Sequence, residues 1–294
     1  MTEKDLTDRK FYRAGEETRF AEGGPERTPQ TAHPAYKLAF RDTDFLLRDE
    51  LRPVRFQLEL LKPEMLLDEA RVGSTLVMYG SARIPSPAQA EARIEAAKNG
   101  DEYDQKVAAR LAEKAKYYDE AYKLARLVSE KGIIENGLRQ FVVTTGGGPS
   151  IMEAGNRGAS DAGSESIGLN IVLPHEQAPN PYVTPELSFN FHYFAIRKMH
   201  FLMRAKAITI FPGGFGTLDE FFETITLIQT KRMAPIPLIL FSRAFWEDII
   251  NFEALAAFGT IAPDDLELFQ FAETAEEAWK IIADFYDLND EAAP

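Results

Sequence analysis

Short apolar segments of strand length alternate with segments of helical spacing through most of this chain. Parallel strands need a crossover between them, so this alternation is typical of a parallel sheet with helices on both faces. We therefore predict an α/β fold built on a doubly wound parallel sheet. The strands are expected at residues 74–80, 141–148, 166–174, 208–214 and 235–242. The helices are expected at residues 101–131, 149–162, 191–207, 216–230, 244–258 and 274–287.

The pattern changes along the chain and predicts three regions. Residues 1–37 mix charged residues with Gly, Pro and Thr and show no hydrophobic period, so we predict a mobile N-terminal arm. Residues 38–72 show helical spacing that Pro53 and Pro63 are expected to break into one or two short helices. This helical extension either packs against the main domain or forms an exposed arm used in oligomerisation. Residues 73–290 form the predicted α/β domain.

Composition excludes several classes of protein. The chain has 294 residues, a formal net charge of −13 and no cysteine, which excludes a disulfide scaffold, a thiolate nucleophile and cysteine-bound metals. The four histidines show no metal-binding spacing, so we expect no metal site, although magnesium held by carboxylates stays open. The negative charge disfavours binding of a nucleic acid polymer. No apolar run is long enough to span a membrane and the N-terminus has no secretory signal, so we expect a soluble, cytoplasmic protein.

Glycines follow three of the predicted strands, at the end of the sheet where ligands bind in open parallel folds. These segments are YGSAR (79–83), TTGGGPSIMEAGNRGA (144–159) and FPGGFGT (211–217). The second segment has Ile151 where a dinucleotide fingerprint needs its third glycine, and the third lacks the Lys-Ser/Thr pair of a P-loop. What remains is a site for one phosphate group.

The third segment is the strongest candidate for that phosphate site. Gly213, Gly214 and Gly216 let the backbone approach a ligand, and we expect them to adopt dihedral angles that other residues avoid. Their amides, with that of Thr217, lie at the start of the next helix, where the helix dipole favours an anion.

Two acids follow these glycines, in what we expect to be the first turn of that helix. Thr217 and Glu220 have the spacing of a capping box, which would explain Glu220 without any chemistry. The preceding helix offers a functional alternative, because Arg197 and Lys198 lie near its start, where cations oppose the dipole and suggest a partner anion. A solvated charged face is the other interpretation of these two cations.

Apolar and polar residues on that preceding helix suggest two separate faces. The predicted buried stripe consists of Phe191, Phe194, Ala195, Met199, Leu202 and Met203. The polar face consists of Tyr193, Arg197, His200 and Arg204.

The segment PGGFGTLDE resembles the P-G-G-x-G-T-x-x-E motif of the Lonely Guy family, the cytokinin riboside 5′-monophosphate phosphoribohydrolases formerly described as lysine decarboxylases. The Arg197-Lys198 pair is similar to the second motif of that family, and the other two glycine segments also resemble it. The similarity extends roughly over residues 74–286, and the long N-terminal segment resembles the longer bacterial branch. One departure is Phe194-Ala195-Ile196, where the family usually has Met-His-Glu.

The resemblance implies a modified Rossmann fold and hydrolysis of the N-glycosidic bond of a nucleoside 5′-monophosphate, either AMP or a cytokinin riboside monophosphate, to a free base and ribose 5-phosphate. It also implies a homodimer or higher homo-oligomer and no cofactor. The implied catalytic pair is Arg197 and Glu220. The implied substrate-binding residues are Gly80, Ser81, Gly147, Gly148, Glu153, Lys198, Gly213, Gly214, Gly216 and Thr217.

Bond cleavage builds positive charge on the ribose and negative charge on the departing base. Our hypothesis is that Glu220 stabilises the sugar and that Arg197 assists the leaving base or the phosphate. Two other functions stay open: a non-catalytic carrier of a nucleotide or molybdenum cofactor, and decarboxylation with pyridoxal phosphate on Lys198.

Overall fold

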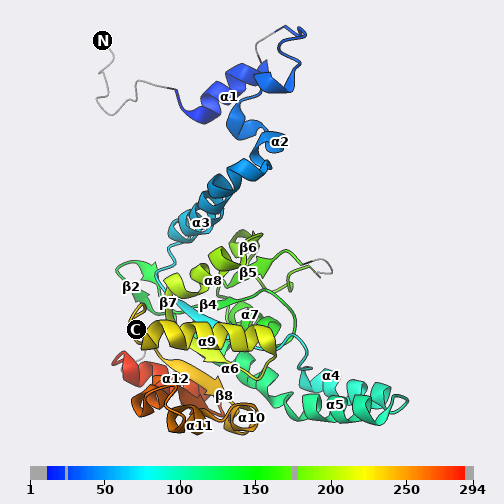
Figure 1. The fold of residues 1–294 in the computed structure, drawn as a ribbon, viewed down its shortest axis with the longest axis vertical. Helices are drawn as coiled ribbons and strands as arrows, with labels where there is room; N and C mark the ends of the chain where they lie inside the picture. The colour runs from blue at the N-terminus through cyan, green and yellow to red at the C-terminus, as the bar shows by residue number, and fades with distance from the viewer. Residues whose placement is uncertain (1–11, 24–25, 174–177, 289–294) are drawn as a thin grey trace. The chain divides into compact units, whose positions relative to one another are not determined.

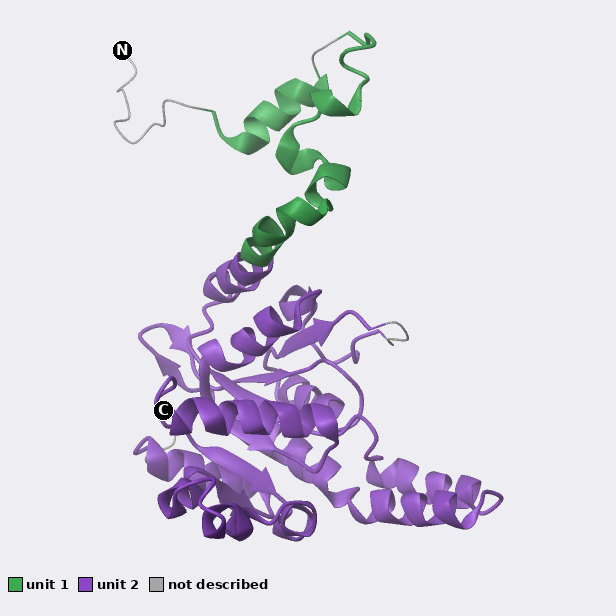
Figure 2. Ribbon diagram, in the orientation of Figure 1, with its two compact units in different colours: residues 1–58 green, residues 59–294 purple. Residues whose placement is uncertain are grey.

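The computed structural model describes residues 12–23, 26–173 and 178–288, and divides the chain into two compact units, residues 1–58 and 59–294 (Figure 2). Residues 1–11 and 24–25 of the predicted mobile arm, and also His175, lie outside the described residues. The three regions expected from the sequence stay predictions.

In its described residues, the first unit contains short α-helices and 3₁₀ turns. Apolar side chains such as Tyr12, Phe20 and Phe40 are exposed in it. Its regular elements are α1 (Ala14–Gly23), α2 (Thr43–Leu46), the first part of α3 (Arg52–Glu69), and 3₁₀ turns at Pro34–Tyr36, Ala39–Arg41 and Asp49–Leu51.

Helix α3 starts at Arg52, so the helical segment is interrupted beside Pro53 as predicted, but it runs unbroken through Pro63, where the predicted break was wrong. Pro53 is the second residue of the helix, where the missing N–H has no intrahelical partner to lose. Pro63 cannot donate to the carbonyl of Glu59 four residues earlier. His200 Nε2 lies 3.1 Å from that carbonyl oxygen, which can only accept, so the imidazole supplies the hydrogen bond that the proline removes.

The second unit contains a seven-stranded sheet in the order β6-β5-β4-β1-β7-β8-β9, in which every pair is parallel (Figure 1). This confirms the predicted α/β fold class. The five predicted strands are β1 (Thr75–Tyr79), β4 (Val142–Thr145), β5 (Ile167–Ile171), β7 (Ala205–Ile210) and β8 (Leu238–Phe241). The others are the edge strands β6 (Ser188–Phe191) and β9 (Gln270–Ala272), and a separate antiparallel pair, β2 (Ile134–Glu135) and β3 (Leu138–Arg139).

Helices connect the strands, and two predicted helices are each split. The predicted helix 101–131 breaks at Lys114 and Ala115, and its second half ends at Gly132, in the expected left-handed conformation (φ 54°). The predicted helix 244–258 breaks where Asn251 caps a new helix by accepting from the Ala254 amide. The helices are α4 (Pro87–Ala97), α5 (Glu102–Glu113), α6 (Lys116–Lys131), α7 (Ile151–Asp161), α8 (Phe194–Met203), α9 (Phe215–Gln229), α10 (Arg243–Ile249), α11 (Phe252–Ala257) and α12 (Ala275–Phe285), with 3₁₀ segments at Pro185–Leu187 and Pro263–Leu268.

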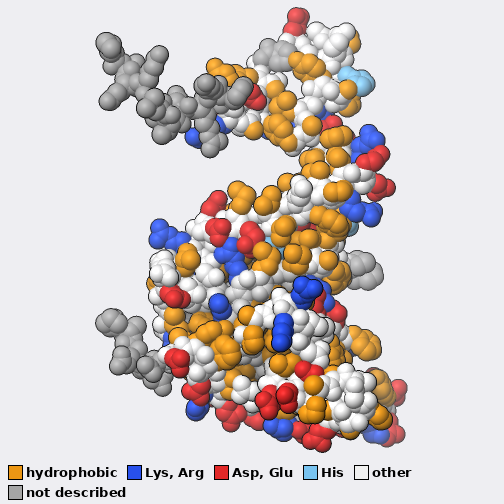
Figure 3. All heavy atoms as spheres, turned by 60° about the vertical axis from the view of Figure 1, so that its left-hand side comes forward, with side chains coloured by type: hydrophobic (Ala, Val, Ile, Leu, Met, Phe, Trp, Pro, Cys, Tyr) orange, Lys and Arg blue, Asp and Glu red, His pale blue; other side chains and the backbone are white. Residues whose placement is uncertain are grey.

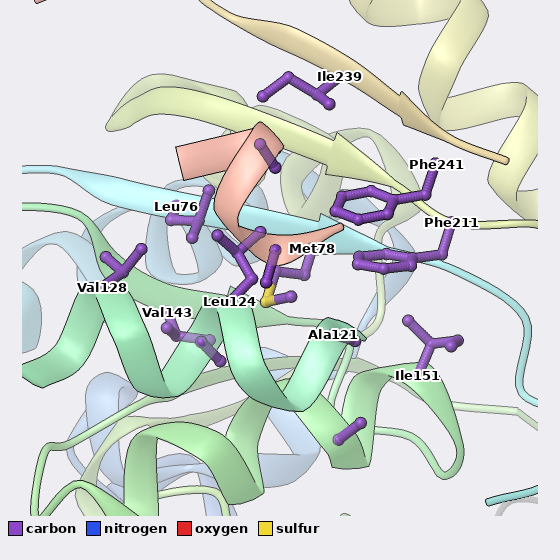
Figure 4. Packing of buried hydrophobic residues seen from close by; sticks show 14 of the residues in the cluster. Leu76, Met78, Ala121, Leu124, Val128, Val143, Ile151, Phe211, Ile239 and Phe241 are labelled. Carbon is purple, nitrogen blue, oxygen red and sulfur yellow. The ribbon is translucent and has the colours of Figure 1, made fainter. Parts of the chain in front are cut away.

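Helices cover both faces of the sheet, and each face has its own buried cluster. Leu76 and Met78 of β1 pack with α6, α7 and α12 on one face, while Val77 and Tyr79 pack with α8, α9 and α10 on the other. Figure 4 shows the first cluster, in which Phe211 stacks on Phe241 with ring centroids 4.1 Å apart.

Hydrophobic side chains also reach the surface, where they lie among acidic and basic ones (Figure 3). Within the described residues, no helix is both long and apolar enough to cross a membrane.

Candidate functional site

The candidate site lies where β1 and β7 end side by side. The chain leaves β1 toward β4, β5 and β6 on one side and returns through β7 to the other side, so the two strands flank the topological switch point of the sheet. The backbone continues this pairing beyond the strands, because Ser81 N donates to Pro212 O at 3.1 Å. The two glycine segments that follow β1 and β7 therefore meet, and they line one wall of a cavity of about 830 Å³.

Eight of the twelve predicted site residues line this cavity. They are Gly80, Ser81, Arg197, Gly213, Gly214, Gly216, Thr217 and Glu220. The remaining four lie elsewhere: Gly147, Gly148, Glu153 and Lys198. From the second glycine segment, Gly146 and Met152 line the cavity instead.

The position of Gly147 has a structural explanation. Its φ is +74°, and a Cβ atom there would overlap the side chain of Asn170. Its carbonyl accepts from the backbone and side chain of Asn180. Glu153 is likewise engaged, because its Oε1 accepts from the Tyr118 hydroxyl at 3.2 Å. The structure thus gives these two residues contacts within the protein, and their contact with substrate stays a prediction.

The glycine turn after β7 differs from the prediction in its backbone. None of Gly213, Gly214 and Gly216 has a positive φ, so the expectation of unusual dihedral angles was wrong. Gly213 is needed because a Cβ atom there would overlap the Thr217 side chain, whereas Gly214 and Gly216 face open space. At Gly214 and Gly216 the absence of a side chain therefore lets a ligand approach the backbone closely.

The capping-box interpretation of Thr217 and Glu220 was also wrong. Helix α9 begins at Phe215, two residues before Thr217, and its N-cap is Gly214, which has no side-chain cap. Thr217 and Glu220 are therefore inside the helix, and neither Asp219 nor Glu220 lies in its first turn. The first amides of α9 are left without a side-chain acceptor.

Glu220 is a buried carboxylate. The residue is 7% exposed, and burial raises its pKa from the ordinary value of 4.5 to about 7, although the charges of Arg197 and Lys198 oppose that rise. Oε1 of Glu220 lies 3.8 Å from Nη1 of Arg197. A carboxyl group with this pKa changes its charge near neutral pH, which is typical of a functional site.

Arg197 and Lys198 are held by different partners. Arg197 Nε donates to the Leu169 carbonyl at 2.7 Å, and its guanidinium lies over the Phe201 ring. Lys198 Nζ lies 2.8 Å from Asp219 Oδ2 and 3.0 Å from Glu223 Oε2. The two cationic side chains are only 13% and 15% exposed, so a solvated charged face is excluded and the expected partner anions are the acids of α9.

The burial pattern of α8 differs from the prediction at most positions, although Phe191 is buried and Leu202 packs against the core as predicted. Phe194, Met199 and Met203, predicted to be buried, are 47–55% exposed, and the fully buried residues of the helix are His200 and Phe201. The predicted helix also began too early, because Phe191 belongs to β6.

Long-range contacts explain this difference. The Glu59 carboxylate accepts from the amides of His192 and Tyr193 just before α8, and Arg204 pairs with Glu64 and Asp68. These acids come from α3, more than 130 residues earlier in the sequence. The polar face of α8 is therefore turned inward by partners that the local sequence does not reveal.

Sequence reasoning missed Tyr79, which also lines the cavity. Its hydroxyl is buried, and burial together with the charge of Glu220 raises the pKa of Tyr79 well above its usual range. Tyr79 stands in an apolar strand segment, where a tyrosine has the same appearance as an ordinary core residue.

A metal ion or a cofactor would need suitable residues in this site. Within residues 12–23, 26–173 and 178–288, no group of three or more His, Asp and Glu side chains could hold a metal ion. Pyridoxal phosphate needs a lysine whose amine is available, but Lys198 is paired with two carboxylates. Burial lowers the pKa of Lys198, yet Asp219 and Glu223 outweigh it and raise the pKa above its ordinary value. These residues do not fit pyridoxal phosphate.

The fold and the site define an α/β protein with a candidate anion site at the switch point of its sheet and a buried carboxylate beside it. The family model described as "Possible lysine decarboxylase" matches residues 152–282. The cytokinin riboside 5′-monophosphate phosphoribohydrolase LOG of Oryza sativa subsp. japonica is 29% identical over 168 residues, which are 56% of this chain and 65% of the rice protein. Both matches show that this chain is similar to the Lonely Guy family over part of its length.

Solved structures with similar folds have low TM-scores. A structural genomics target known from an X-ray structure covers 72% of this chain and 99% of its own, with 22% identity and a TM-score of 0.45. The molybdenum cofactor binding protein of Rippkaea orientalis covers 58% of this chain and 88% of its own, with 20% identity and a TM-score of 0.40. The Moco carrier protein of Chlamydomonas reinhardtii covers 73% and 98%, with 14% identity and a TM-score of 0.42.

Proposed function

We propose that this protein is a nucleoside 5′-monophosphate phosphoribohydrolase, which cleaves AMP or a cytokinin riboside monophosphate to a free base and ribose 5-phosphate. The observation that carries this proposal is that the Arg197–Glu220 pair and the uncapped start of α9 line the same cavity. The activity in the name of the rice relative supports the same reaction.

The start of α9 is the proposed phosphate seat. The first amides of a helix have no intrahelical acceptor, and α9 supplies no side-chain cap for them. The amides of Phe215, Gly216 and Thr217 are therefore available to an anion, which the positive end of the helix dipole also favours. The open space at Gly214 and Gly216 lets a phosphate reach the backbone.

Glu220 is the proposed catalytic carboxylate. Water adds to C1′, the electron pair of the C1′–N bond leaves with the base, and the base gains a proton. Positive charge develops on the ribose in between, and an ionised Glu220 stabilises it. Glu220 is about one helical turn from the phosphate seat, so binding energy from the phosphate positions the bond that breaks.

Arg197 is the proposed partner of that carboxylate. Its hydrogen bond to Leu169 and its stacking on Phe201 fix the guanidinium before substrate arrives. In this position it favours the ionised form of Glu220 and offers a positive charge to the departing base or to the phosphate.

The experiment is to incubate the protein with a panel of nucleoside monophosphates and their nucleosides and to score free base by chromatography. We expect base release from at least one monophosphate and at least a hundredfold slower release from the matching nucleoside, because the nucleoside lacks the phosphate anchor. Equal rates for both would refute the phosphate seat. Tight binding of a monophosphate without base release would favour the carrier function.

We also infer a homodimer or higher homo-oligomer and a cytoplasmic location. The family resemblance motivates the first, and the exposed apolar side chains of Phe194, Met199 and Met203 on α8 give it a candidate surface. Light scattering of the purified protein tests the oligomer. A monomer at all concentrations would contradict it.

A further inference from the structure

The second glycine segment is held by the buried side-chain amide of Asn180. Its Nδ2 donates to the carbonyl oxygens of Gly147 at 3.2 Å and Gly148 at 2.9 Å, and its backbone amide donates to the Gly147 carbonyl at 2.8 Å. Its Oδ1 accepts from the Tyr182 amide at 3.2 Å. Asn180 is buried, and a buried amide with these bonds has a fixed orientation. It therefore holds two successive carbonyl groups of the glycine turn in place.

A second buried asparagine extends this network to the end of β4. Oδ1 of Asn156 accepts from Asn180 Nδ2 at 3.0 Å and from the Thr145 hydroxyl at 2.7 Å. The hydroxyl oxygen of Thr145 accepts in turn from the Gly147 amide at 3.0 Å. Nδ2 of Asn156 donates to Ser166 Oγ at 3.0 Å. The turn is thus fixed through both its amide and its carbonyl groups, and loss of the Asn180 donor would leave buried acceptors short of a partner.

The glycine turn lies directly against the guanidinium of Arg197. A Cβ atom built on Gly146 would lie 2.8 Å from Arg197 Nη2, so the guanidinium occupies the space that a side chain would need there. The ring of Phe201 and the carbonyl of Leu169 contact the same guanidinium. Gly146 is therefore one of the surfaces that confine Arg197 in the cavity.

The turn also packs on the strand that binds Arg197. A Cβ atom built on Gly147 would lie 2.1 Å from Oδ1 of Asn170, which follows Leu169 in β5. Asn170 is itself held, because its Nδ2 donates to the Phe189 carbonyl at 2.9 Å. A shift of the turn would thus disturb both the space around the guanidinium and the strand to which Arg197 Nε donates.

We propose that Asn180 is a positioning residue, whose side-chain amide fixes the turn 146–148 so that the turn confines the Arg197 guanidinium beside Glu220. The confinement of Arg197 is independent of any reaction, but its value for catalysis rests on the proposed function. A group that acts on a developing charge must be held in place before substrate arrives, and this network supplies that support from outside the cavity.

The test uses N180L, which keeps approximately the size of the side chain, adds no charge and removes the donors. The matched control is N190L, the same change at an exposed asparagine of β6. NMR of protein labelled with ¹⁵N-arginine measures hydrogen exchange at Arg197 Nε, with the signal assigned by its loss in R197K. We expect exchange in N180L to be about tenfold faster or more, because the bond to Leu169 opens more often, and exchange in N190L to equal that of wild type.

An exchange rate at Arg197 Nε that is the same in N180L and wild type would overturn the proposal. Should N180L fail to fold by circular dichroism, N180D keeps the shape of the side chain and the acceptor for the Tyr182 amide. An ionised aspartate cannot donate to Gly147 and Gly148, so the same acceleration is expected, with N190D as its control. Unchanged exchange in N180D would overturn the proposal equally.

Turnover gives a second and separable result. In N180L we expect kcat for the cleaved monophosphate to fall by about tenfold or more, because the guanidinium is less well placed. The midpoint of the kcat/KM profile should move upward, since a displaced Arg197 favours the ionised form of Glu220 less. Lys198 of α8 and the acids of α9, which also act on Glu220, are unchanged in this variant. A smaller folded fraction would lower the rate without moving the midpoint.

The two measurements distinguish failure of this proposal from failure of the proposed function. If no monophosphate is cleaved, the proposed function fails, while the exchange rate at Arg197 still decides whether Asn180 positions the guanidinium. If a monophosphate is cleaved and N180L changes neither the exchange rate nor the midpoint, only the role of Asn180 fails.

Discussion

The buried carboxylate of Glu220 should destabilise the fold at neutral pH, and E220Q should remove that destabilisation. The folded protein holds the Glu220 proton up to a pH of about 7, while the unfolded chain releases it near 4.5. A pKa difference of this size corresponds to about 3 kcal/mol. The stabilising contribution of the protonated Glu220 carboxyl is fully present below pH 4.5, is lost as the pH rises through about 7, and is absent above that.

Glutamine cannot ionise, so E220Q lacks this loss of stability. Between pH 5.5 and pH 8, linkage predicts that the stability of E220Q relative to wild type increases by about 2 kcal/mol, the part of the total that falls in this window. The assay is urea unfolding of both proteins at the two pH values, which avoids the isoelectric region near 4.9. Groups other than Glu220 titrate in both proteins and cancel in the difference.

The control is E95Q, which removes an exposed glutamate paired with Lys98 on the surface of α4. Its effect should stay within about 0.5 kcal/mol and should not depend on pH over this range. A constant difference between E220Q and wild type from pH 5.5 to pH 8 would refute the assignment of a raised pKa to Glu220.

Three further predictions concern activity and the glycine turn. The kcat/KM for the cleaved monophosphate should rise with pH through a midpoint near 7, since Glu220 must be ionised, and a flat profile from pH 5.5 to 8.5 would contradict this. R197A should lower kcat by about 10²-fold and move that midpoint upward, because the guanidinium favours the carboxylate; an unshifted midpoint in R197A would show that the two groups do not interact. G213A should destabilise the fold by about 1–3 kcal/mol because its Cβ overlaps Thr217, whereas G216A should stabilise it by up to about 1 kcal/mol yet raise KM by crowding the phosphate seat. Thermal unfolding and initial rates measure both glycine variants, and equal stability of the two would disprove the steric argument.

The sequence predicted the fold class because strand and helix periodicity are local. The apolar runs of β1, β4, β5, β7 and β8 alternate with helices, and this alternation predicts a parallel sheet and its ligand-binding edge. The short edge strand β6 was missed because its phenylalanines continue into the apolar start of α8.

The glycine segments after the strands predicted where the candidate site lies. The prediction failed where contacts with residues far away in the sequence determine how a helix is oriented. The orientation of α8 depends on Glu59, Glu64 and Asp68 of α3, whose positions cannot be inferred from the sequence of α8. The start of α9 at Phe215 removed the capping-box explanation, and only the folded chain revealed that Glu220 is buried. Tyr79 was not predicted as a site residue either, because only the folded chain shows that it lines the cavity.

The central claim is that the start of α9 holds the phosphate and thereby brings the glycosidic carbon to Glu220. A crystal structure of E220Q soaked with AMP tests it most directly, since this variant should bind the nucleotide without cleaving it. We expect the phosphate within hydrogen-bond distance of the amides of Phe215, Gly216 and Thr217, with C1′ beside residue 220 and Arg197. A phosphate bound away from these amides, or a ribose turned away from residue 220, would contradict the account.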